Sequence, residues 1–97
     1  LPPGPMSIDR RAAAGLAEAG LAAVFDPAMV ARLREDSPLE AVGITDADLV
    51  CVSDAVGHAA EARGLVCLLG DADLDGVATV ADLVTAIAGA AMPGGSA

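Results

Sequence analysis

The segment SPLEAVGITDADLV, residues 37–50, joins a turn to the start of a helix and decides how the chain is organised. Thr45 stands three residues before Asp48, a spacing like that of a capping box, although Glu or Gln is the usual partner at the third position. An apolar stripe follows at helical spacing, formed by Leu49, Val52, Val56 and Ala59 or Ala60. The pattern predicts a central helix that ends near Arg63 and Gly64, a basic last turn followed by a capping glycine.

A long helix is predicted before this segment. It opens near Ser7 or Asp9 and ends at Phe25, and its apolar face is formed by Ala17, Leu21, Val24 and Phe25. Asp26 and Pro27 then resemble a helix cap followed by proline at the first helical position, which indicates a short turn of helix.

A final helix is predicted to begin at Thr79. Thr79 and Asp82 repeat the cap spacing, and the predicted buried face is formed by Val80, Leu83, Val84 and Ile87. We expect Gly89 to close this helix. The connection 65–77 leaves room for a short third helix.

The composition favours one small all-α domain. With 97 residues, of which 55% are hydrophobic, the chain can bury one modest core, and Phe25 is its only aromatic residue. Proline, glycine and small residues indicate linkers at 1–5 and 92–97, with the folded domain at 6–91. We expect a domain excised from a longer polypeptide.

The charge excludes several kinds of partner. The chain has fourteen acidic residues and five arginines, which gives a net charge of −9 and no basic surface for nucleic acid. An acidic surface favours basic patches on partner proteins, or simply keeps an apolar domain soluble. No run approaches the roughly 20 apolar residues that span a bilayer, and the start lacks signal-peptide features. We therefore expect a cytoplasmic protein that does not bind membranes.

The cysteines and the single histidine do not form a recognisable site. Cys51 and Cys67 have neither zinc-finger nor Cys-x-x-Cys spacing, and we expect them to be reduced and buried. A disulfide between facing helices is the alternative. His58 has no serine or cysteine at an activating spacing, so no catalysis is predicted.

Several pieces of the chain, in the correct order, resemble the acyl carrier protein family. Leu21–Ala28 resembles the segment before the family's long loop, residues 37–44 resemble the turn before its second helix, and 71–84 resemble the acidic entry into Thr-Val-x-Asp-Leu-Val. The resemblance covers about 16–89. It implies a bundle of three to four helices of the acyl-carrier-protein type.

The family's reactive serine has no counterpart at the start of the central helix. In the family this serine carries 4'-phosphopantetheine, and the matching position here is Asp46 when aligned from Gly43, or Ala47 when the family's Asp-Ser pair is aligned on Asp46. Neither residue can be modified. Three explanations stay open: Ala47 replaces the serine of a carrier, the chain is a natural serine-free pseudo-carrier acting as a scaffold, or Ser53 is the attachment site.

The resemblance implies a carrier domain that has no catalysis of its own. It would present tethered acyl or polyketide intermediates to the catalytic domains of a synthase, such as an iterative polyketide synthase of the enediyne class used in antibiotic biosynthesis. The implied partners are a phosphopantetheinyl transferase, a ketosynthase and other synthase domains, with Asp48 and Leu49 in the recognition helix. We expect the isolated domain to be monomeric.

A calcium site is the competing interpretation. Asp71, Asp73, Asp75, Thr79 and Asp82 have the spacing of EF-hand ligands, and the segment also resembles one repeat of a dockerin, the cohesin-binding module. Ala78 stands where the loop usually has a branched apolar residue, and position twelve is Asp82 instead of Glu. The sequence contains no second complete loop, which weakens this interpretation. Calcium is therefore the alternative cofactor, after 4'-phosphopantetheine.

Overall fold

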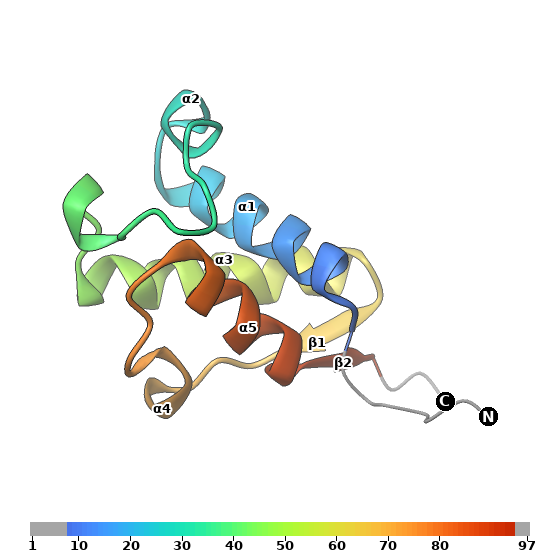
Figure 1. The fold of residues 1–97 in the computed structure, drawn as a ribbon. Helices are drawn as coiled ribbons and strands as arrows, with labels where there is room; N and C mark the ends of the chain where they lie inside the picture. Colours follow the sequence, from blue (N-terminus) through green and yellow to red (C-terminus); the bar gives the residue numbers. More distant parts are fainter. Residues whose placement is uncertain (1–7, 95–97) are drawn as a thin grey trace.

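The computed structural model describes residues 8–94 and is mostly helical (Figure 1). In chain order the elements are α1 (Arg10–Val24), α2 (Pro27–Val30), the 3₁₀ helix η1 (Glu40–Val42), α3 (Asp46–Ala62), β1 (Leu65–Cys67), α4 (Asp71–Leu74), α5 (Val80–Ala90) and β2 (Ala91–Pro93). No helix within residues 8–94 has the length and apolar character required to cross a membrane.

The predicted first helix and the turn after it are confirmed. Asp9 caps α1, because its Oδ1 atom accepts a hydrogen bond of 2.7 Å from the N–H of Ala12. Asp26 caps α2 in the same way at 3.1 Å from the N–H of Ala28, with Pro27 at the first helical position. Acidic side chains satisfy N–H groups that have no partner inside a helix. The suggested start at Ser7 lies outside the described residues.

The core lies where α1, α3 and α5 meet. Its largest fully buried side chains come from these three helices and are Leu16, Leu21, Val52, Val56, Leu83, Val84 and Ile87. The predicted stripe of α3 is buried as expected, with Ala60 rather than Ala59 as its last fully buried member. Val24 is exposed, contrary to the prediction, because α1 ends there and the chain turns away at Asp26.

The segment between α2 and α3 is tied to the start of α5. The N–H of Leu39 donates to the carbonyl of Ala78 at 2.9 Å, and the N–H of Ala81 donates to the carbonyl of Glu35 at 2.8 Å. The N–H of Val80 donates to the carbonyl of Ser37 at 3.3 Å. The first N–H groups of α5 thus find acceptors outside the helix, and this pairing holds the long connection against the bundle.

Two short strands, which the sequence did not predict, accompany the helices of this mostly helical domain, and the fold remains compatible with the predicted all-α class. β1 and β2 pair antiparallel, with Cys67 opposite Ala91 and Leu65 opposite Pro93. Gly89 does not close the last helix, which continues to Ala90 and passes directly into β2. Met92 and Pro93, assigned above to a linker, are therefore part of the domain. Gly94, also assigned to that linker, donates its N–H to the carbonyl of Gly64 at 2.8 Å. The remaining linker assignments, 1–5 and 95–97, lie outside the described residues.

Helix α1 packs tightly against α3 at Gly20. A Cβ atom built on Gly20 would overlap the Cγ2 atom of Val56 and would lie 3.1 Å from the carbonyl oxygen of Val52. The Val56 side chain is stiff about χ1 and the Val52 carbonyl belongs to the backbone of α3, so neither neighbour can move away cheaply. Gly20 is therefore required by packing between the helices rather than by its backbone conformation.

We predict that Gly20→Ala lowers the free energy of unfolding by about 1–3 kcal/mol, the usual cost of overpacking a core. Urea unfolding followed by circular dichroism measures the change. Gly89→Ala is the matched control, because a Cβ there meets no atom within 4 Å and removes the flexibility of a helical glycine. The control should be neutral or more stable by up to about 1 kcal/mol. Equal stability of Gly20→Ala and the parent would contradict the close approach.

Asp82 holds the start of α5 by accepting two backbone hydrogen bonds. Its Oδ2 atom lies 3.0 Å from the N–H nitrogen of Ala78 and 3.1 Å from that of Thr79, while the N–H of Asp82 donates to the Thr79 hydroxyl at 3.2 Å. These backbone donors favour the charged carboxylate and lower the pKa of Asp82. The capping box predicted at Thr79 is thereby confirmed.

This depressed pKa predicts an acid-dependent stability. A carboxyl with a lower pKa in the folded state stabilises the fold above its unfolded pKa of about 3.9, and the contribution is lost as the pH falls through the folded pKa. Asp82→Asn should therefore be less stable at neutral pH and should lose less stability on acidification. Thermal unfolding from neutral to acid pH tests this against Asp36→Asn, which removes the same charge from an exposed loop position. Parallel pH profiles for Asp82→Asn and the parent would refute it.

Candidate functional site

The start of α3 is fixed by a reciprocal cap. The Thr45 hydroxyl accepts from the N–H of Asp48 at 3.2 Å, and the Asp48 carboxylate accepts from the N–H of Thr45 at 2.9 Å. The capping box predicted at this position is confirmed, with aspartate in the place usually taken by glutamate. Both side chains are therefore engaged in capping hydrogen bonds at the start of α3.

The four predicted site residues at this helix start differ in accessibility. Asp46 and Ala47 are exposed in the first turn of α3. Asp48 is half-buried and engaged in the cap, and Leu49 is only 4% exposed because it belongs to the core. Asp48 and Leu49 therefore shape the helix end from within, and the exposed pair forms its outer surface.

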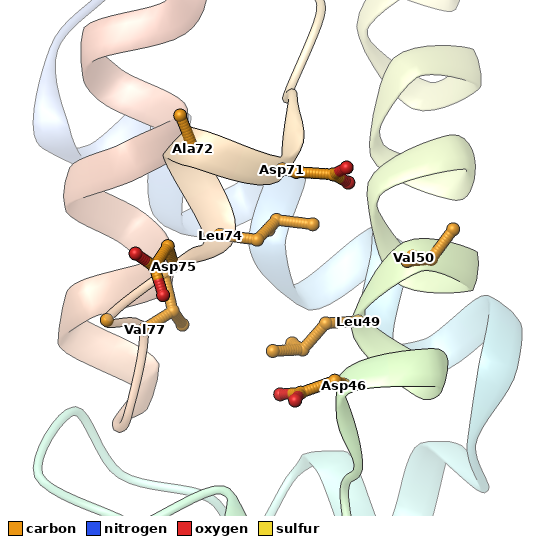
Figure 2. Close-up of a pocket in the computed structure, with 9 residues that line it drawn as sticks. Asp46, Leu49, Val50, Asp71, Ala72, Leu74, Asp75 and Val77 are labelled. Atoms are coloured by element: carbon orange, nitrogen blue, oxygen red, sulfur yellow. The ribbon is translucent and has the colours of Figure 1, made fainter.

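Two hollows share Asp46 and Leu49 among their lining residues. One, of about 450 Å³, separates the start of α3 from α4, and Figure 2 shows Asp46 and Leu49 on one side facing Asp71 and Leu74 on the other. The second, of about 560 Å³, lies between α3 and the turn formed by residues 38–44. Both are lined by Asp46, Leu49 and Val77. Ala47 lines neither hollow, so the two candidate positions differ in what they face.

The hollow between α3 and α4 combines apolar walls with negative charge. Leu49, Leu74 and Val77 supply apolar surface, and the carboxylates of Asp46, Asp71 and Asp75 stand around it. No arginine is among the described residues that line either hollow. Such a surface suits an apolar or positively charged group and repels free anions.

The runner-up attachment residue, Ser53, lies inside α3 and not at its end. Its side chain is half-buried, and its hydroxyl donates to the carbonyl of Val50 at 2.7 Å. A serine bonded back to its own helix in this way is a common arrangement that needs no function. The geometry gives Ser53 no feature of an activated nucleophile.

The residues of the calcium motif are not gathered around one point. Asp73 folds back to accept from the N–H of Gly70 at 2.9 Å, and Asp82 caps α5. Asp71 to Leu74 form the short helix α4 in place of an extended ligand loop. Within residues 8–94, no three side chains of His, Cys, Asp or Glu are placed to hold one metal ion. The geometry therefore gives no support to the calcium alternative.

Several residues of the hollows were not singled out from the sequence. Val50, Leu74 and Val77 line the space between α3 and α4, and Leu39 and Ile44 line the neighbouring one. Asp46, Leu49 and Val50 stand at the i, i+3 and i+4 spacing of one helix face, which was a readable signal. The part contributed by the connection 71–77 depends on how α4 is placed, and the sequence does not specify that.

Comparison with known proteins gives no match: no family model fits the chain, and neither a curated protein nor a solved structure resembles it closely enough to count.

The two cysteines are in different environments. Cys67 is buried in β1, and desolvation, with a further contribution from the negative charge of Asp73, raises the pKa of its thiol. Cys51 is exposed on α3, so the expectation of burial is confirmed for Cys67 and is wrong for Cys51. Both are free thiols, and because Cys67 lies on a strand there is no disulfide between helices.

We predict that a thiol reagent such as dithionitrobenzoate modifies Cys51 rapidly and Cys67 only when the protein unfolds. The thiolate is the reactive form, and burial both blocks access and disfavours it. Absorbance of the released thiolate should show one fast thiol in buffer and two in denaturant. Cys51→Ser should abolish the fast phase and Cys67→Ser should leave it intact. Two equally fast thiols in the native protein would show that Cys67 is not protected.

Proposed function

We propose that this chain is a carrier-type helical domain that presents a helix start to the enzymes of a biosynthetic synthase. The element order supports this: a long helix, a long connection, a central helix, a short helix and a final helix, the sequence of elements expected from the carrier resemblance. The bundle of α1, α3 and α5 would act as a scaffold, and the chemistry would belong to the partner enzymes.

The observation that carries the proposal is the accessible start of α3 beside an apolar hollow. Asp46 and Ala47 are exposed in its first turn, and Asp46 faces the space lined by Leu49, Leu74 and Val77. A group attached at this point would be reachable by an enzyme and could rest an apolar chain against α4. Each methylene group buried there would stabilise that position by about 0.8 kcal/mol.

Phosphopantetheine does not fit this chain as it stands. Attachment needs an exposed hydroxyl, and positions 46 and 47 carry a carboxylate and a methyl group. Asp46 and Asp48 also place two acidic side chains in the first turn of α3, where an attached phosphate would otherwise gain from the helix dipole. The chain in this form would therefore bind the partners of a carrier without being loaded.

The two alignments of the missing serine now have different structural support. A hydroxyl at position 46 would face both hollows, whereas one at position 47 would be exposed but would line neither. Position 46 offers an attached chain more apolar surface. Position 47 keeps the acidic residue before the serine that the family pattern has. The two substitutions can be compared directly.

We predict that Ala47→Ser or Asp46→Ser restores loading, and that the unaltered chain stays unmodified. Each protein is incubated with coenzyme A and a broad-specificity phosphopantetheinyl transferase, and intact mass reports the gain of one phosphopantetheine group. Thr45 remains in both variants to cap α3, so the helix start should persist. Circular dichroism of both variants checks that it does.

A control separates the attachment residue from a background reaction. Ser53→Ala in the unaltered chain and in each variant removes the hydroxyl inside α3. A mass gain in the unaltered chain that Ser53→Ala abolishes would assign the site to Ser53. If neither variant gains mass while a known carrier protein in the same tube does, the carrier assignment of this helix start is wrong.

A further inference from the structure

Leu68 is an apolar side chain left in solvent. It is 79% exposed, more than Val24, Val42, Val50 and Met92, which are the other exposed large apolar residues in the described part of the chain. Its neighbours Cys67 and Leu69 are buried and half-buried, so Leu68 points away from the core while the chain beside it is anchored. A single exposed leucine is ordinary, and its meaning depends on its surroundings.

A groove lies beside Leu68. It has a volume of about 430 Å³ and separates one side of α3, from Val50 to Glu61, from residues 67–70, and we call it the Leu68 groove. Gly57 also lines this groove, and a Cβ atom built there would make an ordinary contact of 3.4 Å with the Cys67 carbonyl oxygen. Val50, 54% exposed, lines this groove and also the hollow between α3 and α4, so the two depressions share one wall.

The rim of the Leu68 groove is predominantly acidic. Asp54 and Glu61 stand about one and three turns of α3 beyond Val50. The Nε2 atom of His58 lies 3.6 Å from Asp54 Oδ2. The adjoining hollow adds Asp46, Asp71 and Asp75. None of the chain's five arginines lines either depression. Apolar surface bordered by carboxylates is therefore continuous along this side of α3.

We propose that the Leu68 groove is the docking site for a basic amphipathic helix of a partner protein. Leu68 and Val50 would contact the apolar face of that helix, and arginine or lysine at its edges would meet Asp54 and Glu61. The inference does not need the chain to be loaded, so it is independent of the attachment residue proposed above.

The charges favour a basic helix over a second copy of the chain, a lipid surface or a nucleic acid as the occupant of the groove. Two copies of this chain related by symmetry across the groove would bring Asp54 and Glu61 of each copy together, and a net charge of −9 on each would add repulsion. Anionic lipid surfaces and nucleic acids carry the wrong sign for the same reason. A positively charged helix has the required complementarity of both charge and apolar surface.

The test uses a fluorescent synthetic helical peptide built from leucine and lysine, with a leucine–glutamate peptide of the same pattern as its counterpart. Fluorescence anisotropy should show binding of the lysine peptide only, weakening as salt rises. Leu68→Ser should reduce its affinity roughly tenfold, because a leucine is no longer buried on binding. Glu61→Gln should reduce the affinity and its salt dependence.

Matched variants decide whether the binding is specific to the groove. Val24→Ser removes an exposed apolar side chain from the end of α1, and Asp36→Asn removes a charge from the loop, and both should bind like the parent. No binding of the lysine peptide, or equal losses in all variants, would overturn the proposal. Sedimentation of the chain alone provides a further check, and self-association that Leu68→Ser abolishes would instead make a second copy the occupant. Failure of phosphopantetheine loading would leave these measurements unaffected.

Discussion

The close contact between Gly20 of α1 and Val56 of α3 is the constraint on which the rest of the domain depends. It allows two helices with small and branched side chains to share a core without any large aromatic residue, since Phe25 is the only one in the chain. α5 then covers the remaining side of this pair through Leu83, Val84 and Ile87. Close packing of small side chains replaces the volume that aromatic residues supply elsewhere.

Once the helices are packed, their starting points determine the character of the surface. α3, α4 and α5 each have an aspartate at the third position whose carboxylate accepts from backbone N–H groups at the helix start. Part of the acidic composition is thus structural. The carboxylates that stay free of such bonds, Asp71 and Asp75 among them, surround apolar hollows. The net charge therefore gives a poor picture of which acidic residues face a partner.

Features that depend on neighbouring residues could be predicted from the sequence, whereas contacts between segments far apart in the chain could not. Caps at Asp26, Thr45 and Thr79 depend on residues three or fewer apart, so helix starts could be predicted from the sequence. The pairing of β1 with β2 joins segments far apart in the chain, and neither strand has an alternating pattern of its own. The hollows were missed for the same reason, since their walls combine α3 with the placement of α4.

The helix α4 gives the molecule an uneven stiffness. It has four residues, none of them buried, whereas α1, α3 and α5 each contribute several fully buried side chains. Opening α4 breaks few apolar contacts and costs less free energy than separating the bundle helices. The wall that α4 contributes to the hollow beside Asp46 is consequently the easiest part of the domain to displace. Movement of α4 would let the hollow accept bound groups of different width while the packing between Gly20 and Val56 stays unchanged.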